Sequence, residues 1–138
     1  MIIMSVDYGD VRTGVAVCDK NEILASPVTV VTEKDADMLV EKIICLAIER
    51  NVQMFVVGLP KNMDGSEGFR AQACRDFAEK LKEKSGLPAE LYDERLTTVS
   101  AHNALNMTNT RGKKRKAVVD AVSAVMILED YMSSRKPR

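Results

Sequence analysis

The chain has 138 residues, of which 46% are hydrophobic and 29% are charged, and its formal net charge is zero. These values are typical of one soluble domain with a single core, so we expect one domain over residues 1–138. The zero net charge excludes a protein that is basic over its whole surface. Residues 111–116 and the C-terminal Arg-Lys-Pro-Arg nevertheless form local basic clusters that could bind a polyanion.

No segment of the sequence has the pattern of a secretion signal or a membrane span. The apolar residues 2–6 are too few for either, so we expect a cytoplasmic protein with no membrane partner. The three cysteines, Cys18, Cys45 and Cys74, lie in or beside apolar segments at wide spacing. That pattern predicts buried, reduced thiols and argues against a zinc site.

The first part of the chain predicts three strands, at residues 2–6, 14–18 and 23–31. Residues 19–21 predict a tight turn between the second strand and the third. Pro27 indicates that the third strand is an edge strand or contains a bulge. Three successive strands with short connections imply an antiparallel meander.

A helical period begins after the meander. Residues 32–35 resemble a capping box, and the spacing of apolar residues predicts a helix over 35–50. A β-branched run at 52–58 predicts a buried parallel strand, followed by a loop. A second helix is expected over 67–85, with one apolar face. That face would contain Phe69, Ala73, Phe77 and Leu81.

The last part of the chain predicts a strand at 91–93 and a short helix at 98–107. The polar residues 106–114 are expected to be mobile, and the final helix is expected over 115–132. The resulting element order is β-β-β-α-β-α-β-α.

Carboxylates stand at the ends of these elements. Asp7 directly follows the first strand, and Asp93 and Glu94 follow the fifth, so both positions reach the crevice edge of an α/β sheet. Neighbouring strand residues face opposite sides, so only one of the latter pair reaches the crevice, and we favour Glu94 for its longer side chain. Asp120 interrupts the apolar face of the last helix, where a buried acid needs a cation, a donor or water.

Acids gathered in this way can bind a divalent metal ion, and carboxylate-bound metal ions commonly catalyse phosphodiester hydrolysis. Each acid also has a structural interpretation: a turn at Asp7, an exposed pair at 93–94, and a salt bridge at Asp120. The element order together with the acid positions predicts an α/β protein with a ribonuclease H-like fold, a mixed five-stranded sheet flanked by helices.

Basic and polar residues around the acids could bind a nucleic-acid backbone. The candidates are Arg12, Lys61, Asn62, Arg95, Thr97, Thr98, Lys113, Lys114, Arg115 and Lys116. Asp64 is expected to be a turn or cap residue ahead of the next helix, and His102 a surface or packing residue.

Four motifs carry a resemblance to a known family. They are DYGDVRTGVA at 7–16, GLPKNMDGS at 58–66, DERLTT at 93–98 and VDAVSAVMIL at 119–128. Their order and spacing resemble the YqgF family, also called RuvX, over nearly the whole chain.

The resemblance implies a ribonuclease H-like fold related to the resolvase RuvC and a metal-dependent nuclease activity. It implies that Asp7, Glu94 and Asp120 are catalytic and hold Mg²⁺ or Mn²⁺. It also implies processing of the 5′ end of pre-16S ribosomal RNA. RuvC-type enzymes place an acid near the end of the fourth strand, where this chain has Gly58-Leu59-Pro60, so Glu94 is expected to compensate from the fifth strand.

Three alternatives remain open. One is a Holliday junction resolvase acting on branched DNA, which would need a symmetric dimer, whereas an RNA-trimming enzyme could be a monomer. Another is a non-catalytic RNA-binding factor for ribosome assembly, binding structured RNA by its backbone. The third is a relative of nucleotide-binding ATPases and sugar kinases, because Asp7-x-Gly before a hairpin also begins those folds; such proteins need a second domain to form their cleft.

Overall fold

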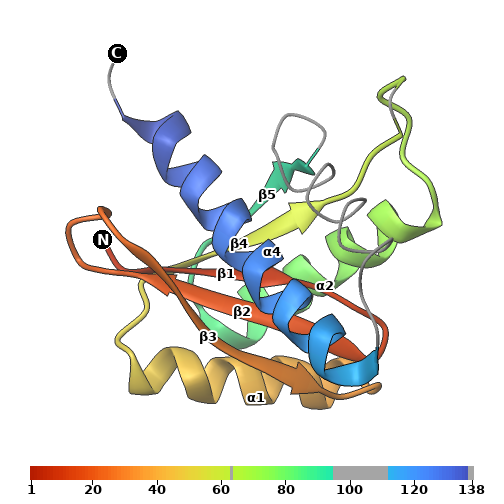
Figure 1. The fold of residues 1–138 in the computed structure, drawn as a ribbon, viewed down its shortest axis with the longest axis horizontal. Coiled ribbons are helices and arrows are strands. Elements are labelled where there is room, and N and C mark those ends of the chain that lie inside the picture. Colours follow the sequence, from red (N-terminus) through yellow and green to blue (C-terminus); the bar gives the residue numbers. More distant parts are fainter. Residues whose placement is uncertain (63, 95–111, 137–138) are drawn as a thin grey trace.

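The structure is a computed structural model that describes residues 1–62, 64–94 and 112–136, with the backbone alone in 112–120. Five strands form one sheet in the order β3-β2-β1-β4-β5. Helices α1 and α2 pack on one face of this sheet and α4 crosses the other (Figure 1). The elements are β1 (Ile3–Asp7), β2 (Arg12–Cys18), β3 (Ala25–Thr32), α1 (Ala36–Glu49), β4 (Met54–Leu59), α2 (Phe69–Ser85), β5 (Ala89–Asp93) and α4 (Gly112–Arg135).

The N-terminal strands form the expected antiparallel meander. Strand β1 pairs antiparallel with β2, which pairs antiparallel with β3. The β2–β3 register shifts between Val15 and Ala16, and Ala16 pairs with Pro27. The edge position and the bulge expected from Pro27 are both confirmed, because β3 is an outer strand of the sheet.

The central strands β1 and β4 are parallel and are covered on both faces. All six residues of β4 are buried, as expected from its continuous apolar sequence. Along β1, Met4 and Val6 pack toward α1 and α2, whereas Ile3 packs toward α4. Ser5 faces α4 as well, and its Oγ donates a hydrogen bond of 2.6 Å to the carbonyl of Ala124.

Two helix starts differ from the sequence expectation. Helix α1 begins at Ala36, and its N-cap is Asp35, whose Oδ1 accepts from the backbone N–H groups of Asp37 and Met38 at 2.9 and 3.0 Å. The expected capping box at 32–35 is wrong, because Thr32 ends β3. The Asp35 side chain alone satisfies two of the free N-terminal amides of α1, and the backbone N–H of Asp35 donates to Glu33 at 3.2 Å.

Helix α2 begins at Phe69, two residues later than expected, and Phe69 is 93% exposed. The expected apolar face was therefore misplaced at its N-terminal end. The buried residues of α2 are Ala71, Cys74, Phe77, Ala78 and Leu81. The first buried residues of this face are the small Ala71 and Cys74. The helical spacing of the large side chains therefore predicted burial of Phe69, which is exposed.

Other boundaries moved by two or three residues. Strand β3 starts at Ala25, and Ile23 and Leu24 are 71% and 65% exposed in the hairpin turn, where Asp19 accepts hydrogen bonds from both of their backbone amides. Helix α4 starts at Gly112 and so includes part of the segment expected to be mobile. The expected short helix at 98–107 lies outside the described residues. None of the described helices is long and apolar enough to span a membrane.

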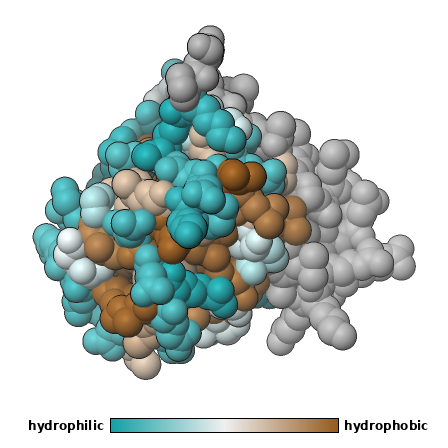
Figure 2. Space-filling view, turned by 90° about the vertical axis from the view of Figure 1, so that its left-hand side faces the viewer, coloured by the Kyte–Doolittle hydropathy of each residue, from teal (hydrophilic) through white to brown (hydrophobic). Residues whose placement is uncertain are grey.

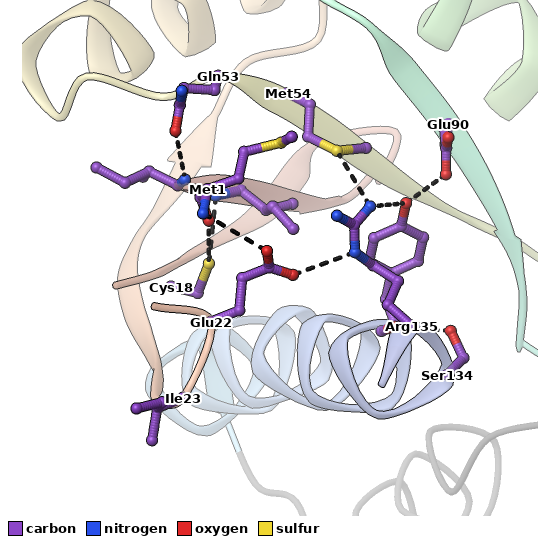
Figure 3. Close-up of polar contacts among 12 residues, drawn as sticks. Met1, Cys18, Glu22, Ile23, Gln53, Met54, Glu90, Ser134 and Arg135 are labelled. Atoms are coloured by element: carbon purple, nitrogen blue, oxygen red, sulfur yellow. Dashed lines mark hydrogen bonds and ion pairs between the residues drawn. The ribbon is translucent and has the colours of Figure 1, made fainter. Parts of the chain in front are cut away.

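The C-terminal end of α4 is tied to the side of the sheet on which the N-terminus lies (Figures 1 and 3). The Arg135 guanidinium donates to Glu22 at 3.1 Å and to the Tyr131 hydroxyl at 3.2 Å. The Tyr131 hydroxyl donates in turn to Glu90. Figure 2 views the molecule from this side and shows apolar residues interspersed with polar ones. These contacts fix the helix that carries Asp120 relative to the β2–β3 hairpin and β5.

The cysteines give a direct test of this packing. Cys18 and Cys74 are 5% and 2% exposed, but Cys45 is exposed, so the expectation of three buried thiols is wrong for Cys45. Burial raises the pKa of Cys18 and raises that of Cys74 to about 11. Because the thiolate is the reactive form, we expect one thiol per chain to react quickly with Ellman's reagent at pH 8 and all three after unfolding in guanidinium. Cys45→Ser should abolish the fast phase, and a fast phase that survives would contradict the packing of α2 or β2.

Candidate active site

Three parallel strands end at one edge of the sheet. Strand β1 ends at Asp7, β4 at Leu59 and β5 at Asp93, and their carboxyl ends lie side by side. In open α/β sheets this edge is where ligands bind. Strand β2 runs antiparallel to β1 and begins at Arg12, so Arg12 reaches the same edge.

Asp7 and Gly58 occupy neighbouring positions on the face that packs against α4. Asp7 follows Val6, which pairs with Val57, so Gly58 comes next on the adjoining strand. Alternation along each strand puts Asp7 on the side of Ile3 and Ser5, and Gly58 on the side of Met54 and Val56.

The Glu94 carboxylate lies over Gly58. A Cβ atom at Gly58 would stand 3.1 Å from both Cδ and Oε1 of Glu94, and 2.8 Å from Cδ1 of Ile127 on α4. The missing side chain of Gly58 thus leaves the space that the Glu94 carboxylate fills. The structure therefore brings Asp7 and Glu94 to the same edge and the same face of the sheet, on either side of the end of β4.

Asp93 points away from this pair. It pairs with Leu59 in the β4–β5 ladder and shares a strand face with Leu91, which packs toward α1 and α2. The preference for Glu94 over Asp93 agrees with this geometry. Burial raises the pKa of Glu94, the neighbouring Asp93 raises it further, and the charge of Arg70 lowers it. Ionising Glu94 therefore costs free energy that a nearby cation would offset.

The loop after Asp7 is built around Gly9. A Cβ at Gly9 would lie 1.9 Å from the carbonyl oxygen of Arg12, so only glycine fits there. The backbone N–H of Gly9 donates to Oγ1 of Thr13 at 3.2 Å, which closes the loop onto β2. The local sequence Asp-Tyr-Gly thus produces a tight turn that holds the end of β1.

Arg70, in the first turn of α2, holds the same loop from the other side. Its guanidinium donates to the Tyr8 carbonyl and, at 2.8 Å, to the Asp10 carboxylate. It also lies 5.1 Å from the centroid of the Tyr8 ring, which stacks on Phe77 at 4.4 Å. Sequence reasoning missed Arg70, because 60 residues separate it from Asp10. Its place at the start of a helix that follows a crevice loop is the signal that could have indicated it.

Lys61 and Asn62, both predicted to bind nucleic acid, lie in the loop between β4 and α2. Lys61 Nζ is 3.8 Å from Glu67, and Asn62 Nδ2 donates to Ser66 Oγ at 2.9 Å. Arg75 donates to both oxygens of Glu67 at 2.5 and 2.6 Å, which anchors the loop to α2. Nearby, Asp64 accepts from the Ser66 backbone N–H at 2.9 Å, which confirms its expected role in a turn.

The other predicted site residues fall outside the described side chains. Asp120 belongs to α4, four residues before Ala124, but its side chain is not among those described. The same holds for Lys113, Lys114, Arg115 and Lys116, and neither the backbone nor the side chains of Arg95, Thr97, Thr98 and His102 are described. Among the described residues, no group of three or more His, Cys, Asp or Glu side chains could hold a metal ion.

A cavity of about 390 Å³ lies at the opposite edge of the sheet, between the ends of α1 and α2. Its lining is mostly apolar and contains no carboxylate. The cavity therefore offers no carboxylate ligand for the expected metal ion. Its lining residues are Ile44, Ala47, Ile48, Asn51, Val52, Lys84, Ser85 and Leu87.

Solved structures show which fold the chain has. Thermus thermophilus RuvC in complex with a Holliday junction substrate is 12% identical, with a TM-score of 0.60, and the match covers 100% of this chain and 99% of that one. The fowlpox virus Holliday junction resolvase is 15% identical, with a TM-score of 0.56 and coverage of 97% and 99%. The chain has the ribonuclease H-like fold of these proteins, as its sequence predicted.

Sequence comparison gives the family. The RuvX family, described as Holliday junction resolvase, matches residues 1–134. A Rhodopirellula baltica relative is 44% identical over 140 residues, covering 99% of this chain and 79% of its own. A Lachnospira eligens relative is 42% identical over 142 residues, covering 99% of each. Both are named as candidate pre-16S rRNA nucleases. The chain belongs to the RuvX family, a family of nucleases, which hydrolyse phosphodiester bonds.

Proposed function

We propose that this protein is a metal-dependent nuclease that processes the 5′ end of pre-16S ribosomal RNA. The observation that carries the proposal is the position of the Glu94 carboxylate over Gly58, the residue beside Asp7 at the edge where three parallel strands end. The names of its relatives supply the substrate, because proteins 42–44% identical over 99% of this chain are named for pre-16S rRNA.

The donor set suits Mg²⁺ or Mn²⁺. Both ions prefer carboxylate oxygens, and here two carboxylates stand at the same edge of the sheet, one at the end of β1 and one after β5, with β4 between these strands. The raised pKa of Glu94 is in keeping with a buried carboxylate whose charge a metal ion would balance. We infer from the sequence that Asp120 is the third ligand, because helical spacing puts it on the face of Ala124 and Ile127. When bound, such an ion supplies Lewis-acid chemistry at a phosphodiester.

The chain's own residues position the substrate. Arg12 lies at the edge where β1 ends, and Lys61 lies in the loop that follows β4, so both can approach a phosphate near Asp7. Gly9 closes the turn after Asp7 and holds its carboxylate at the strand end. Fixed donors around a reacting phosphate contribute more than mobile ones, because they do not reorganise during the reaction.

Branched DNA is the second candidate substrate, favoured by the description of the family as Holliday junction resolvase. A resolvase must cut two strands symmetrically, so this function requires a homodimer. RNA trimming can be performed by a monomer. Substrate and oligomeric state are therefore tested together.

The experiment is cleavage of two substrates in Mn²⁺, with the reaction repeated in EDTA. One substrate is a 5′-extended 16S precursor fragment and the other is a synthetic four-way DNA junction. We expect cleavage of the RNA that stops in EDTA. If a dimer instead cuts the junction symmetrically, the substrate is branched DNA and the proposal of an RNA substrate is wrong. If the protein binds the RNA but cleaves neither substrate in the presence of metal, the nuclease proposal is wrong and the protein is a non-catalytic assembly factor.

A further inference from the structure

Arg70 and Asp10 form an ion pair at the mouth of the candidate active site. The distance between Arg70 Nη1 and Asp10 Oδ1 is 2.8 Å, and the two side chains are 39% and 87% exposed. Asp10 follows the strand that delivers Asp7, and Arg70 lies in the first turn of α2. The pair thus stands in solvent between two segments that border the crevice.

The rest of the guanidinium is held firmly. Its second terminal nitrogen donates to the carbonyl of Tyr8, and the group lies over the Tyr8 ring, which is itself stacked on Phe77. Phe77 is 2% exposed, so the platform under the guanidinium belongs to the core. Arg70 is therefore fixed in direction, whereas its carboxylate partner is mostly surrounded by water.

An exposed ion pair of this kind is weak, because water solvates both charges. A phosphate diester offers the guanidinium two oxygens and binds it by parallel hydrogen bonds, for which the planar fork of arginine is well shaped. Arg70 contacts Tyr8 and Asp10, which follow Asp7 by one and three residues. A phosphate at Arg70 would therefore lie at the edge of the sheet where Asp7 ends β1.

We propose that Arg70 binds a backbone phosphate of the nucleic-acid substrate, and that Asp10 occupies the guanidinium until this phosphate displaces it. The inference rests on the proposed nuclease function and adds a binding residue to it. It gives Asp10 a definite role: its carboxylate competes with the substrate and keeps the cation oriented in the free protein.

The test is binding of the 5′-extended 16S precursor fragment in EDTA, so that affinity is measured apart from cleavage. Arg70→Gln should weaken binding about 5- to 20-fold near 0.1 M salt and reduce the slope of log K against log salt by about 1, as expected for one lost phosphate contact. Asp10→Asn should strengthen binding about 2- to 5-fold, because the competing charge is gone. Arg70→Lys should restore part of the affinity, because it keeps the charge but not the fork.

A purely structural ion pair would give the opposite sign for Asp10. If the pair only braced the loop, Asp10→Asn would weaken binding as Arg70→Gln does, and that result would overturn the inference. In the double variant Arg70→Gln/Asp10→Asn, the gain in RNA affinity from Asp10→Asn should vanish, because the guanidinium that Asp10 occupied is absent. Lys80→Gln is the matched control: it removes one charge from α2 and breaks a 3.2 Å pair with Asp37, away from the crevice.

Cleavage by the same wild-type preparation separates the two proposals. If the wild type cleaves the RNA in Mn²⁺ but Arg70→Gln binds it equally well, only the role of Arg70 is rejected. If the wild type neither binds nor cleaves the RNA, both proposals fail.

Discussion

Replacing Asp7 with asparagine is expected to lower the rate of RNA cleavage by about 1,000-fold in Mn²⁺. The carboxylate ends β1 on the face shared with Gly58 and Glu94, and asparagine keeps its shape while removing the charge that would hold the metal. Affinity for the RNA in EDTA should not fall, because the variant removes one negative charge and no positive side chain. The rate is measured by single-turnover cleavage, and the affinity by titration of the labelled fragment.

Asp37→Asn is the matched control for this variant. Asp37 is 64% exposed on α1, on the opposite face of the sheet, so its loss should leave cleavage unchanged. The thermal midpoint of Asp7→Asn should stay within a few degrees of the wild type, which separates lost chemistry from lost folding. Cleavage by Asp7→Asn within 10-fold of the wild-type rate would remove Asp7 from the site and, with it, the proposed metal set.

The fold followed from sequence because local and global signals agree in this chain. The short apolar runs of β1 and β2, the continuous apolar run of β4 and the position of Pro27 each predicted one element of the observed sheet. Asp7 was found because it ends a strand at a sheet edge, and that rule depends only on element order.

The remaining features depend on packing between distant segments. Phe69 was expected in the core because its spacing fits a helix, but α2 begins at that residue and its buried face starts with Ala71. Arg70 contacts Tyr8 and Asp10 across a long stretch of chain, and no local pattern reports such a contact. Spacing predicts which residues share a face, whereas only the three-dimensional structure shows which charges meet.

Gly58 is the clearest case of a residue whose importance lies in what it lacks. From sequence, the absence of an acid at the end of the fourth strand was a departure from RuvC-type enzymes. In the structure, the same absence makes room for the Glu94 carboxylate, 3.1 Å from where a Cβ would stand. A glycine on β4 and a glutamate after β5 together place an acid near that strand end.

Gly58→Ala is therefore expected to lower cleavage about 10- to 100-fold, because a displacement of a few tenths of an ångström at a reacting centre is costly. Stability should fall by only about 1 kcal/mol, since overpacking against Ile127 is partly offset by the better strand preference of alanine. Activity comes from the cleavage assay and stability from urea unfolding. Gly68→Ala is the control, because a Cβ at Gly68 meets nothing within 4 Å.

A second change separates the two contacts of the added methyl group. Ile127→Val removes Cδ1, the atom 2.8 Å from the new Cβ, and leaves the contact with Glu94 in place. In the double variant the losses of stability should therefore be less than additive, while cleavage stays as low as in Gly58→Ala. If the double variant instead recovers wild-type cleavage, the defect came from a shift of α4. Gly58 would then be needed for the packing of α4, and its proposed role of leaving space for the Glu94 carboxylate would be rejected.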